Sequence, residues 1–482
     1  MESRVEQQVR PRAARVWFAA ALFLHLLFLV SLTTGWLDPL CVEASQGHGQ
    51  ASDFFGIYQA GANLIAGHSI YDSEDYRHEA PLAVPYYYFY RYLPPTAYAA
   101  GLFAALLPPW PAYWVWVCYN ELLLVLILLS LARTPGVPAS RRWVASGLWL
   151  ACFPLYIEQF MGQFSLTMAA LLWLFWRYDR LPATTPPTPA SAGVAEQRAA
   201  NPPRPSLAGS IAALAHDWRR YRWRADRLAP HGPWLAWSAS LVLKSFSAML
   251  ALPILRDRQL KRLLLAAGLG LLVCLPYFLA RPADLIEFAR LNFNPFTPAV
   301  YKGAFGLQTW LHDLTARLPQ AWHASALALL GREISAAKLL QLAPGAVVLL
   351  LAVAATLRLR ARPDRRALDL AIWTAVFLLI FKSVWEYHYL MILPALSALY
   401  LRTGARSLIL WGGLFAAPTL YAAAPLIAGV ASAAPLDDWP GWFRSLHFSV
   451  KVIPTIGLFA WCIRQTWRPG QGALARSELQ AH

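Results

Sequence analysis

The chain has 482 residues, of which 57% are hydrophobic and only 14% are charged. A soluble globular domain has about 25% charged residues, so this composition excludes an ordinary soluble enzyme and indicates a membrane protein. The formal net charge of +16 does not indicate nucleic-acid binding, because the arginines cluster between apolar blocks, as in the cytoplasmic loops of membrane proteins.

Apolar blocks recur from Val16 to Arg464, each near the length of about 20 residues at which a helix crosses a bilayer. We therefore expect an all-α, polytopic transmembrane protein with about 10 crossings, a re-entrant pair and an outer surface helix. The five cysteines form neither a disulfide framework nor a metal-binding spacing. No metal and no cofactor is predicted. The first apolar block has no convincing cleavage site, which predicts an anchor that is retained.

The order of charges predicts the topology of the first membrane module, residues 16–177. The arginine-rich N-terminus, 1–15, is expected in the cytoplasm, and 16–36 crosses outward. The loop 37–92 is rich in acidic residues, with Arg77 and Arg91 as its basic residues, which places it outside. A proline-bounded helix at 93–107 is expected on the outer surface, and 112–132 returns. A hairpin follows, with crossings at 143–158 and 164–177 and a turn at 159–163.

Residues 178–232 are rich in proline, alanine and arginine and are predicted to form a cytoplasmic linker. Its second half has the composition of a basic amphipathic helix on anionic lipid. The apolar stretch 233–255 is flanked by basic residues on both sides, so we favour two half-helices that enter and return, with a turn near Lys244, over a single crossing. The second membrane module, 233–467, continues with crossings at 263–280, 344–357, 367–383, 389–401, 407–425 and 448–464, an outer loop at 281–343 and a cytoplasmic tail at 468–482.

This topology brings several polar groups to the outer face. Asp53, Gln163, Lys244 and the segment 385–388 lie in four separate parts of the sequence. Polar and ionisable groups in or beside membrane segments are costly and usually functional. We therefore expect a single site on the outer side.

An ordered set of short motifs resembles a known family. The residues that carry it are Asp53-Phe54-Phe55 with Tyr58, Gly61, Leu64, Gly67 and Tyr71; Tyr92-Leu93-Pro94-Pro95; Gly162-Gln163-Phe164-Ser165-Leu166; Lys244; and Trp385-Glu386-Tyr387-His388-Tyr389 followed by Pro394. Together they resemble the GT-C class of membrane glycosyltransferases, and within it the bacterial polyprenol-phosphate-mannose-dependent α-1,2-mannosyltransferases. The similarity covers about residues 50 to 395. The chain departs from the family at Ser165, where asparagine is usual, and at Ser247, where proline is frequent.

The resemblance implies an inverting transferase in the bacterial inner (cell) membrane, with its active site on the extracytoplasmic side. It would move a sugar, mannose in the family, from a polyprenyl-phosphate donor to a hydroxyl of an outer-face lipid or glycan acceptor. Its partners would be the donor, the acceptor and membrane lipids, with no nucleic acid and no nucleotide sugar.

Inverting transfer needs one base and a cationic partner for the leaving phosphate. Asp53 is the expected base; its alternative role is a helix N-cap, and Asp75 and Glu79 are the next candidates for the base. Lys244 is expected to bind phosphate, or else to form a structural ion pair.

Five further residues are expected at the substrate. His388 could hydrogen-bond the phosphate, with Glu386 tuning it, although a histidine at a helix end is often an ordinary interfacial residue. Gln163 could bind sugar hydroxyls, or simply form the turn. The resemblance adds Tyr58 and Trp385 as substrate contacts.

Two other functions stay open. A transporter or flippase for a lipid-linked or polar substrate would usually show internal repeats with broken helices in both halves, and the sequence shows one such break, at Lys244. A non-catalytic scaffold would leave the outer polar groups unexplained.

Overall fold

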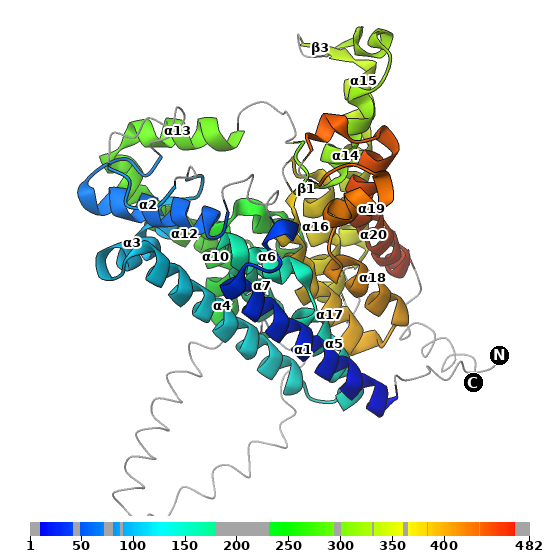
Figure 1. Ribbon diagram of the computed structural model, residues 1–482, viewed down its shortest axis with the longest axis horizontal. Helices are drawn as coiled ribbons and strands as arrows, with labels where there is room; N and C mark the ends of the chain where they lie inside the picture. Colours follow the sequence, from blue (N-terminus) through cyan, green and yellow to red (C-terminus); the bar gives the residue numbers. More distant parts are fainter. Residues whose placement is uncertain are drawn as a thin grey trace, which may run out of the picture.

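The computed structural model describes residues 10–41, 49–71, 81–86, 90–178, 231–293, 300–329, 332–359, 365–382, 384–432 and 434–467. Within these residues the chain is helical apart from two short two-stranded pairs (Figure 1), which confirms the all-α prediction. Residues 179–230 of the predicted linker 178–232, residues 1–9 of the N-terminus 1–15, the tail 468–482, and the candidate bases Asp75 and Glu79 lie outside the described residues.

The first half of the bundle contains the following helices: α1 (Pro11–Thr34), η1 (Asp38–Leu40), α2 (Ser52–Ala66), α3 (Pro94–Leu106), α4 (Pro109–Ala132), α5 (Ala139–Leu150), α6 (Phe153–Met161) and α7 (Ser165–Tyr178). The second half contains the following elements: α10 (Gly232–Leu243), η3 (Ser245–Leu250), α11 (Ala251–Arg256), α12 (Leu260–Ala280), α13 (Pro282–Phe293), β1 (Ala304–Phe305), α14 (Leu307–Ala316), η4 (Gln320–His323), β2 (Ser325–Leu329), β3 (Arg332–Ser335), α15 (Ala336–Arg358), α16 (Arg365–Ile380), β4 (Val384–Trp385), η6 (Glu386–Ile392), α17 (Leu393–Thr403), α18 (Arg406–Ala416), η7 (Leu420–Ala423), α19 (Ala424–Ala428), η8 (Leu436–Asp438) and α20 (Gly441–Trp467).

Five helices in the described part of the chain are long and apolar enough to cross a membrane: α1, α4, α12, α15 and α20. The number rises to seven if two bent pairs each count as one span: α5 with α6, bent by 41°, and α18 with the segment Leu420–Ala428, bent by 65°. The expected ten crossings are not reached by this measure, because α7, α16 and α17 are short. The 16 residues of α16 rise only about 24 Å, against a hydrocarbon core of about 30 Å.

The distribution of apolar side chains is that of a membrane protein. On α1, Val16 and Phe23 are 68% and 63% exposed, and on α12, Leu265 is 68% exposed. Such exposure of large apolar residues on long helices is favourable in lipid and costly in water. The short helices α16 and α17 are instead buried at the centre of the bundle, with nearly every residue from Ala367 to Leu379 and from Leu393 to Leu401 covered.

The expected surface helix, α3, packs along α2 and does not stand alone. A Cβ on Gly61 would lie 2.6 Å from the backbone nitrogen of Gly101, so glycine is required for the two helices to approach this closely. With 13 residues, α3 is about 20 Å long and too short to span the hydrocarbon core. It lies with α2 and α13 on one side of the bundle (Figure 1).

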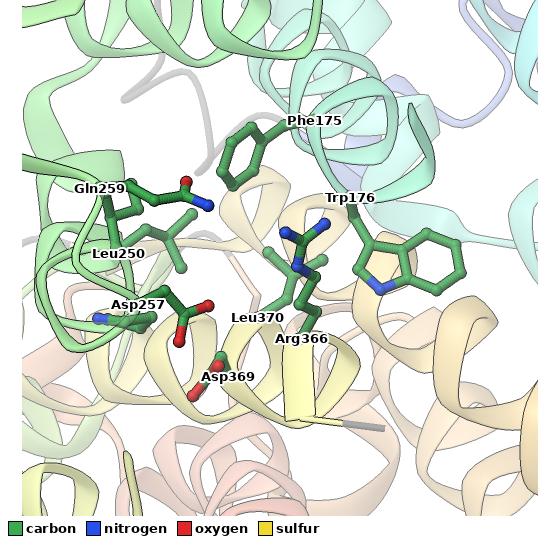
Figure 2. Close-up of a pocket in the computed structure, with 10 residues that line it drawn as sticks. Phe175, Trp176, Leu250, Asp257, Gln259, Arg366, Asp369 and Leu370 are labelled. Atoms are coloured by element: carbon green, nitrogen blue, oxygen red, sulfur yellow. The ribbon is translucent and has the colours of Figure 1, made fainter. Parts of the chain in front are cut away.

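The apolar stretch 233–255 breaks at Lys244, which has extended backbone angles of −145° and 117° between α10 and η3. Both ends of the stretch lie near the C-terminal end of α7. The Phe175 ring is 5.4 Å from that of Trp234 in α10. Phe175 also lines a small pocket with Pro253 and Asp257 at the end of α11 (Figure 2). The stretch therefore breaks at Lys244, and its two ends lie close together near the end of α7.

Ion pairs connect the C-terminal end of the stretch 233–255 to the central helices. The guanidinium of Arg256 forms a fork with the carboxylate of Asp369 in α16, with distances of 3.0 and 2.8 Å. It also donates to Asp257 and to the carbonyl of Thr356. Figure 2 shows the carboxylates of Asp257 and Asp369 side by side in the small pocket. Their oxygens are occupied by arginines, including Arg365, so this pocket is a structural junction.

Candidate functional site

A cavity of about 440 Å³ lies where α2, the turn after α6, the break at Lys244, α13 and η6 meet. Five of the residues predicted from the sequence line it together: Asp53, Gln163, Lys244, Trp385 and His388. Polar side chains from four distant parts of the chain thus share one cavity. Volumes of about 300 to 1,000 Å³ are usual for small-molecule sites.

Asp53 reaches the cavity because the start of α2 is fixed to the end of α6. The N–H of Ala51, which has a positive φ of 65°, donates to the carbonyl of Phe160 at 2.7 Å. Gly162 also has a positive φ, 70°, and a Cβ on it would lie 2.3 Å from the Cβ of Phe54. Only glycine allows this approach, and it brings Asp53 beside the next residue of the turn, Gln163.

The side chain of Gln163 is held on both sides. Its amide Nε2 donates to the hydroxyl of Tyr92 at 2.9 Å, and its Oε1 accepts from Lys244 Nζ at 3.3 Å. The indole of Trp116 donates to the Gln163 carbonyl at 3.1 Å. The turn predicted at 159–163 begins later than expected, because α6 continues to Met161. The turn that follows, with Gly162 and Gln163, presents an oriented amide between Asp53 and Lys244.

Lys244 and His388 face each other, with 3.1 Å between Nζ and Nε2. The backbone N–H of Trp385 donates to His388 Nδ1 at 3.0 Å. Burial and the charge of Lys244 lower the pKa of His388 well below its usual range, so the ring is neutral and its proton lies on Nε2. Two donors therefore meet in the cavity without an acceptor between them, and an oxyanion could accept from both.

Asp53 is an ionisable group in an unfavourable environment. It is only 6% exposed, and its Oδ2 has no hydrogen-bond partner among the described residues. Burial raises the pKa of Asp53 to about 6, while hydrogen bonding to Gln163 and the charges of Lys244 and Arg91 oppose the rise. The residue preceding α2 is Ala51, with no side-chain cap, so the alternative of Asp53 as N-cap is not realised.

Trp385 forms an aromatic wall of the cavity. The antiparallel pair β1–β4 places Trp385 opposite Ala304, and its ring stacks on that of Tyr301 at 5.9 Å and 14°. The lining also includes five apolar side chains: Phe246, Met249, Leu291, Phe377 and Phe381. The cavity lining therefore has a polar part and an apolar part.

The structure does not bring Tyr58 and Glu386 to the cavity, and these two predictions are corrected. The hydroxyl of Tyr58 donates to the carbonyl of Leu107 at 2.8 Å. The carboxyl of Glu386 points toward α20, with Oε1 3.7 Å from Lys451 Nζ and Oε2 accepting from Thr419 at 3.3 Å. Glu386 is thus a partner of Lys451 and does not tune His388.

Two charged residues near the site were missed from the sequence. Arg91 lines the cavity, and Glu158 lies fully buried behind the turn of Gln163. Each had a usable signal: Glu158 is the acidic residue inside the apolar block 143–158, and Arg91 is one of two basic residues in an acidic loop.

Comparison with protein-family models finds no match, and comparison with curated proteins finds no relative of significant similarity. The described residues contain no group of three or more histidine, cysteine, aspartate or glutamate side chains that could hold a metal ion. The residues of the cavity are therefore the evidence for the function of this chain.

Proposed function

We propose that this chain is an inverting membrane glycosyltransferase. It moves a sugar, with mannose as the first candidate, from a polyprenyl-phosphate donor to a hydroxyl of a lipid or glycan acceptor. The observation that carries the proposal is the pair of donors, Lys244 Nζ and His388 Nε2–H, that meet 3.1 Å apart in the cavity that also holds the carboxyl of Asp53, whose Oδ2 has no hydrogen-bond partner among the described residues.

The proposed reaction is a single displacement at the anomeric carbon. The acceptor oxygen forms a bond to that carbon while the bond from the carbon to the phosphate oxygen breaks, and the electron pair leaves with the polyprenyl phosphate. Asp53 accepts the proton of the attacking hydroxyl. Lys244 and His388 donate hydrogen bonds to the departing phosphate, whose charge grows in the transition state.

The apolar part of the cavity suits the lipid part of such a donor. Phe246, Met249, Leu291 and Phe381 are among its lining residues. A phosphate at the polar part and a prenyl chain along the apolar part would use both parts of the cavity.

The proposed place is a multi-pass position in the bacterial inner membrane, with the cavity on the extracytoplasmic side. The support is the charge distribution: the arginine clusters at 133–142, 256–262 and 358–366 follow helices that lead away from the cavity, as the positive-inside rule requires of cytoplasmic ends.

The test is direct transfer by purified protein. Radiolabelled polyprenyl-phosphate-mannose is incubated with membrane lipid extract and either wild-type protein or Asp53→Asn. Asp284→Asn is the matched control, because this buried carboxylate accepts from Tyr277 and does not line the cavity. Transfer by wild type and by the control, with a loss of about a hundredfold or more in Asp53→Asn, would support the proposal.

Binding of the donor can be measured apart from transfer. Lys244→Met and His388→Gln each remove one charged or polar contact to phosphate, which is usually worth about 1.5 to 3 kcal/mol, so affinity for polyprenyl phosphate should fall about 10- to 100-fold in each. Tight binding by wild type without transfer to any acceptor would favour the transporter reading. No binding of any polyprenyl phosphate would overturn the proposed transferase and leave a transporter of another polar substrate.

A further inference from the structure

Lys244 is a partly buried cation without a bonded carboxylate. Among the described residues, no carboxylate oxygen lies within 4.0 Å of its Nζ, so the structural ion pair considered as its alternative role is not formed there. Asp53 and Glu158 act on it from a greater distance. In the same part of the chain, one oxygen accepts from Nζ, that of the Gln163 amide at 3.3 Å. A charge removed from water is costly without partners, so other groups must offset this cost.

Three aromatic rings lie close to this ammonium group. The distance from Lys244 Nζ to the ring centroid is 4.8 Å for Phe164, 5.2 Å for Tyr387 and 6.0 Å for Tyr92. The face of an aromatic ring is negative and attracts a cation within about 6 Å of the centroid. We call these three rings the aromatic cage. They come from separate segments: the residues before α3, the residue before α7, and η6.

Contacts with the rest of the site hold the rings of the cage in place. The ring of Phe164 meets that of Tyr92 edge to face, with centroids 4.6 Å apart and an angle of 70°, and the Tyr92 hydroxyl is bonded to Gln163. The ring of Tyr387 meets that of His388 in the same way, at 4.7 Å and 76°. The rings that face the lysine thus pack on the side chains that share the cavity with it.

A ring and a carboxylate have different effects on an anion that enters the cavity. A carboxylate bonded to the ammonium would repel a phosphate and compete with it for the same N–H donors. An aromatic ring attracts the ammonium but carries no net charge. Phe164 is 1% exposed and is absent from the cavity lining, unlike Tyr92 and Tyr387. The Phe164 ring can therefore affect a ligand only through the residues that it contacts.

We propose that the aromatic cage takes the place of a bonded carboxylate and holds the ammonium of Lys244 charged and in position for an anionic phosphate. Phe164 is then a positioning residue that acts through Lys244. This inference rests on the proposed function, since it takes the anion that the lysine binds to be a phosphate. When the phosphate enters, it accepts hydrogen bonds from the ammonium, and the rings stay where they are.

The test weakens one ring of the cage and leaves its shape nearly unchanged. Phe164 is replaced by mono-, di- and trifluorinated phenylalanine through nonsense suppression, because each fluorine draws electron density from the ring face and lowers its attraction for a cation. The control is the same series at Phe160, which is also 1% exposed and makes no cation–π contact among the described residues. Binding of polyprenyl monophosphate in detergent is measured by isothermal titration calorimetry at about pH 6.5 and about pH 9. The other charged or titratable groups around Lys244 are the same in every variant: Asp53, Arg91, Tyr92, Glu158, Lys382, Tyr387 and His388.

The loss of affinity should depend on both fluorine number and pH. A weaker cage lets the lysine lose its proton at a lower pH, and only the charged form binds phosphate. At about pH 9 the affinity should fall with each fluorine, by about fivefold for the trifluorinated ring, and at about pH 6.5 it should stay within about twofold of wild type. The Phe160 series should match wild type at both pH values. In the Lys244→Met background, fluorination of Phe164 should have no effect, because the group through which it acts is gone.

A second measurement needs no ligand. The neutral amine of a lysine is its nucleophilic form, so at about pH 7 an acylating reagent should modify Lys244 about fivefold faster in the trifluorinated protein than in wild type. Mass spectrometry of the peptide that contains Lys244 gives the rate.

Three outcomes overturn the inference: a Phe164 series that binds and reacts like wild type, an equal loss of affinity at both pH values, or the same loss from the Phe160 series. A wild type that binds no polyprenyl monophosphate overturns the proposed function instead. The acylation rate of Lys244 then decides whether the cage holds the lysine charged.

Discussion

Replacing Asp53 with asparagine should abolish transfer and at the same time stabilise the protein. A pKa raised from 3.8 to about 6 means that the ionised form costs the folded state about 3 kcal/mol relative to the unfolded chain. Asparagine has nearly the same shape and carries no charge, so it escapes this cost. Because Asp53 is 6% exposed, solvent screening reduces the figure little.

The direction of the Asp53 pKa shift determines the pH range over which this residue affects stability. The unfolded chain ionises near 3.8 and the folded protein near 6, so the contribution of Asp53 to the free energy of unfolding is largest below about pH 4. It falls between about pH 4 and 6 and is constant above. Asp53→Asn should therefore match wild type near pH 4 and exceed it by about 3 kcal/mol at pH 7.5.

The assay is thermal unfolding in detergent, followed by intrinsic tryptophan fluorescence, together with transfer activity. For a chain of 482 residues, 1 kcal/mol corresponds to about 1 °C in Tm, so a gain of about 3 °C is expected at pH 7.5. Wild-type kcat/KM should rise about tenfold per pH unit up to about pH 6 and then level off, as for a base with that pKa.

Asp369→Asn is the matched control for stability. The carboxylate of Asp369 is held by the guanidinium fork of Arg256, so its loss leaves a buried cation without its main partner and should destabilise by about 3 kcal/mol. If Asp53→Asn also destabilised at pH 7.5, or if its gain did not vanish toward pH 4, the assignment of Asp53 as a carboxyl whose ionised form is disfavoured by burial would be refuted.

Two further predictions concern residues near Asp53. Gly162→Ala should abolish activity and lower Tm, because its Cβ would lie 2.3 Å from the Cβ of Phe54. The control is Gly136→Ala, which has a similar positive φ and nothing within 4 Å; it should cost only about 1 kcal/mol of backbone strain and retain transfer. Tyr58→Phe should leave KM for the donor unchanged, because its hydroxyl bonds the carbonyl of Leu107; a tenfold rise in KM would restore Tyr58 to the site.

The sequence predicted the features that composition and charge control. The helical class follows from the apolar blocks, and the break at Lys244 follows from arginines on both sides of one apolar stretch. The sequence predicted the number of crossings less well, because α16 and α17 are buried by protein and can therefore be shorter than a helix that faces lipid.

The errors within the site have a geometric cause. Tyr58 lies five residues after Asp53 in an α-helix, about 140° away around the axis, so the two side chains face different neighbours. Glu386 and His388 are two residues apart in a 3₁₀ segment with three residues per turn, which separates them by about 120°. Residues that lie close together in one motif thus contact different partners, and the local helix type determines which partner each side chain faces.

The stretch 233–255 begins beside the end of α7, and this affects where the chain can be cut into two pieces. Phe175 precedes residues 179–230 and Trp234 follows them, and their ring centroids lie 5.4 Å apart. The described chain therefore leaves and resumes at nearly the same place. The cavity therefore does not depend on covalent continuity through this segment. Two separately synthesised pieces, cut between residues 179 and 230, should assemble in one membrane into a protein with the same cavity.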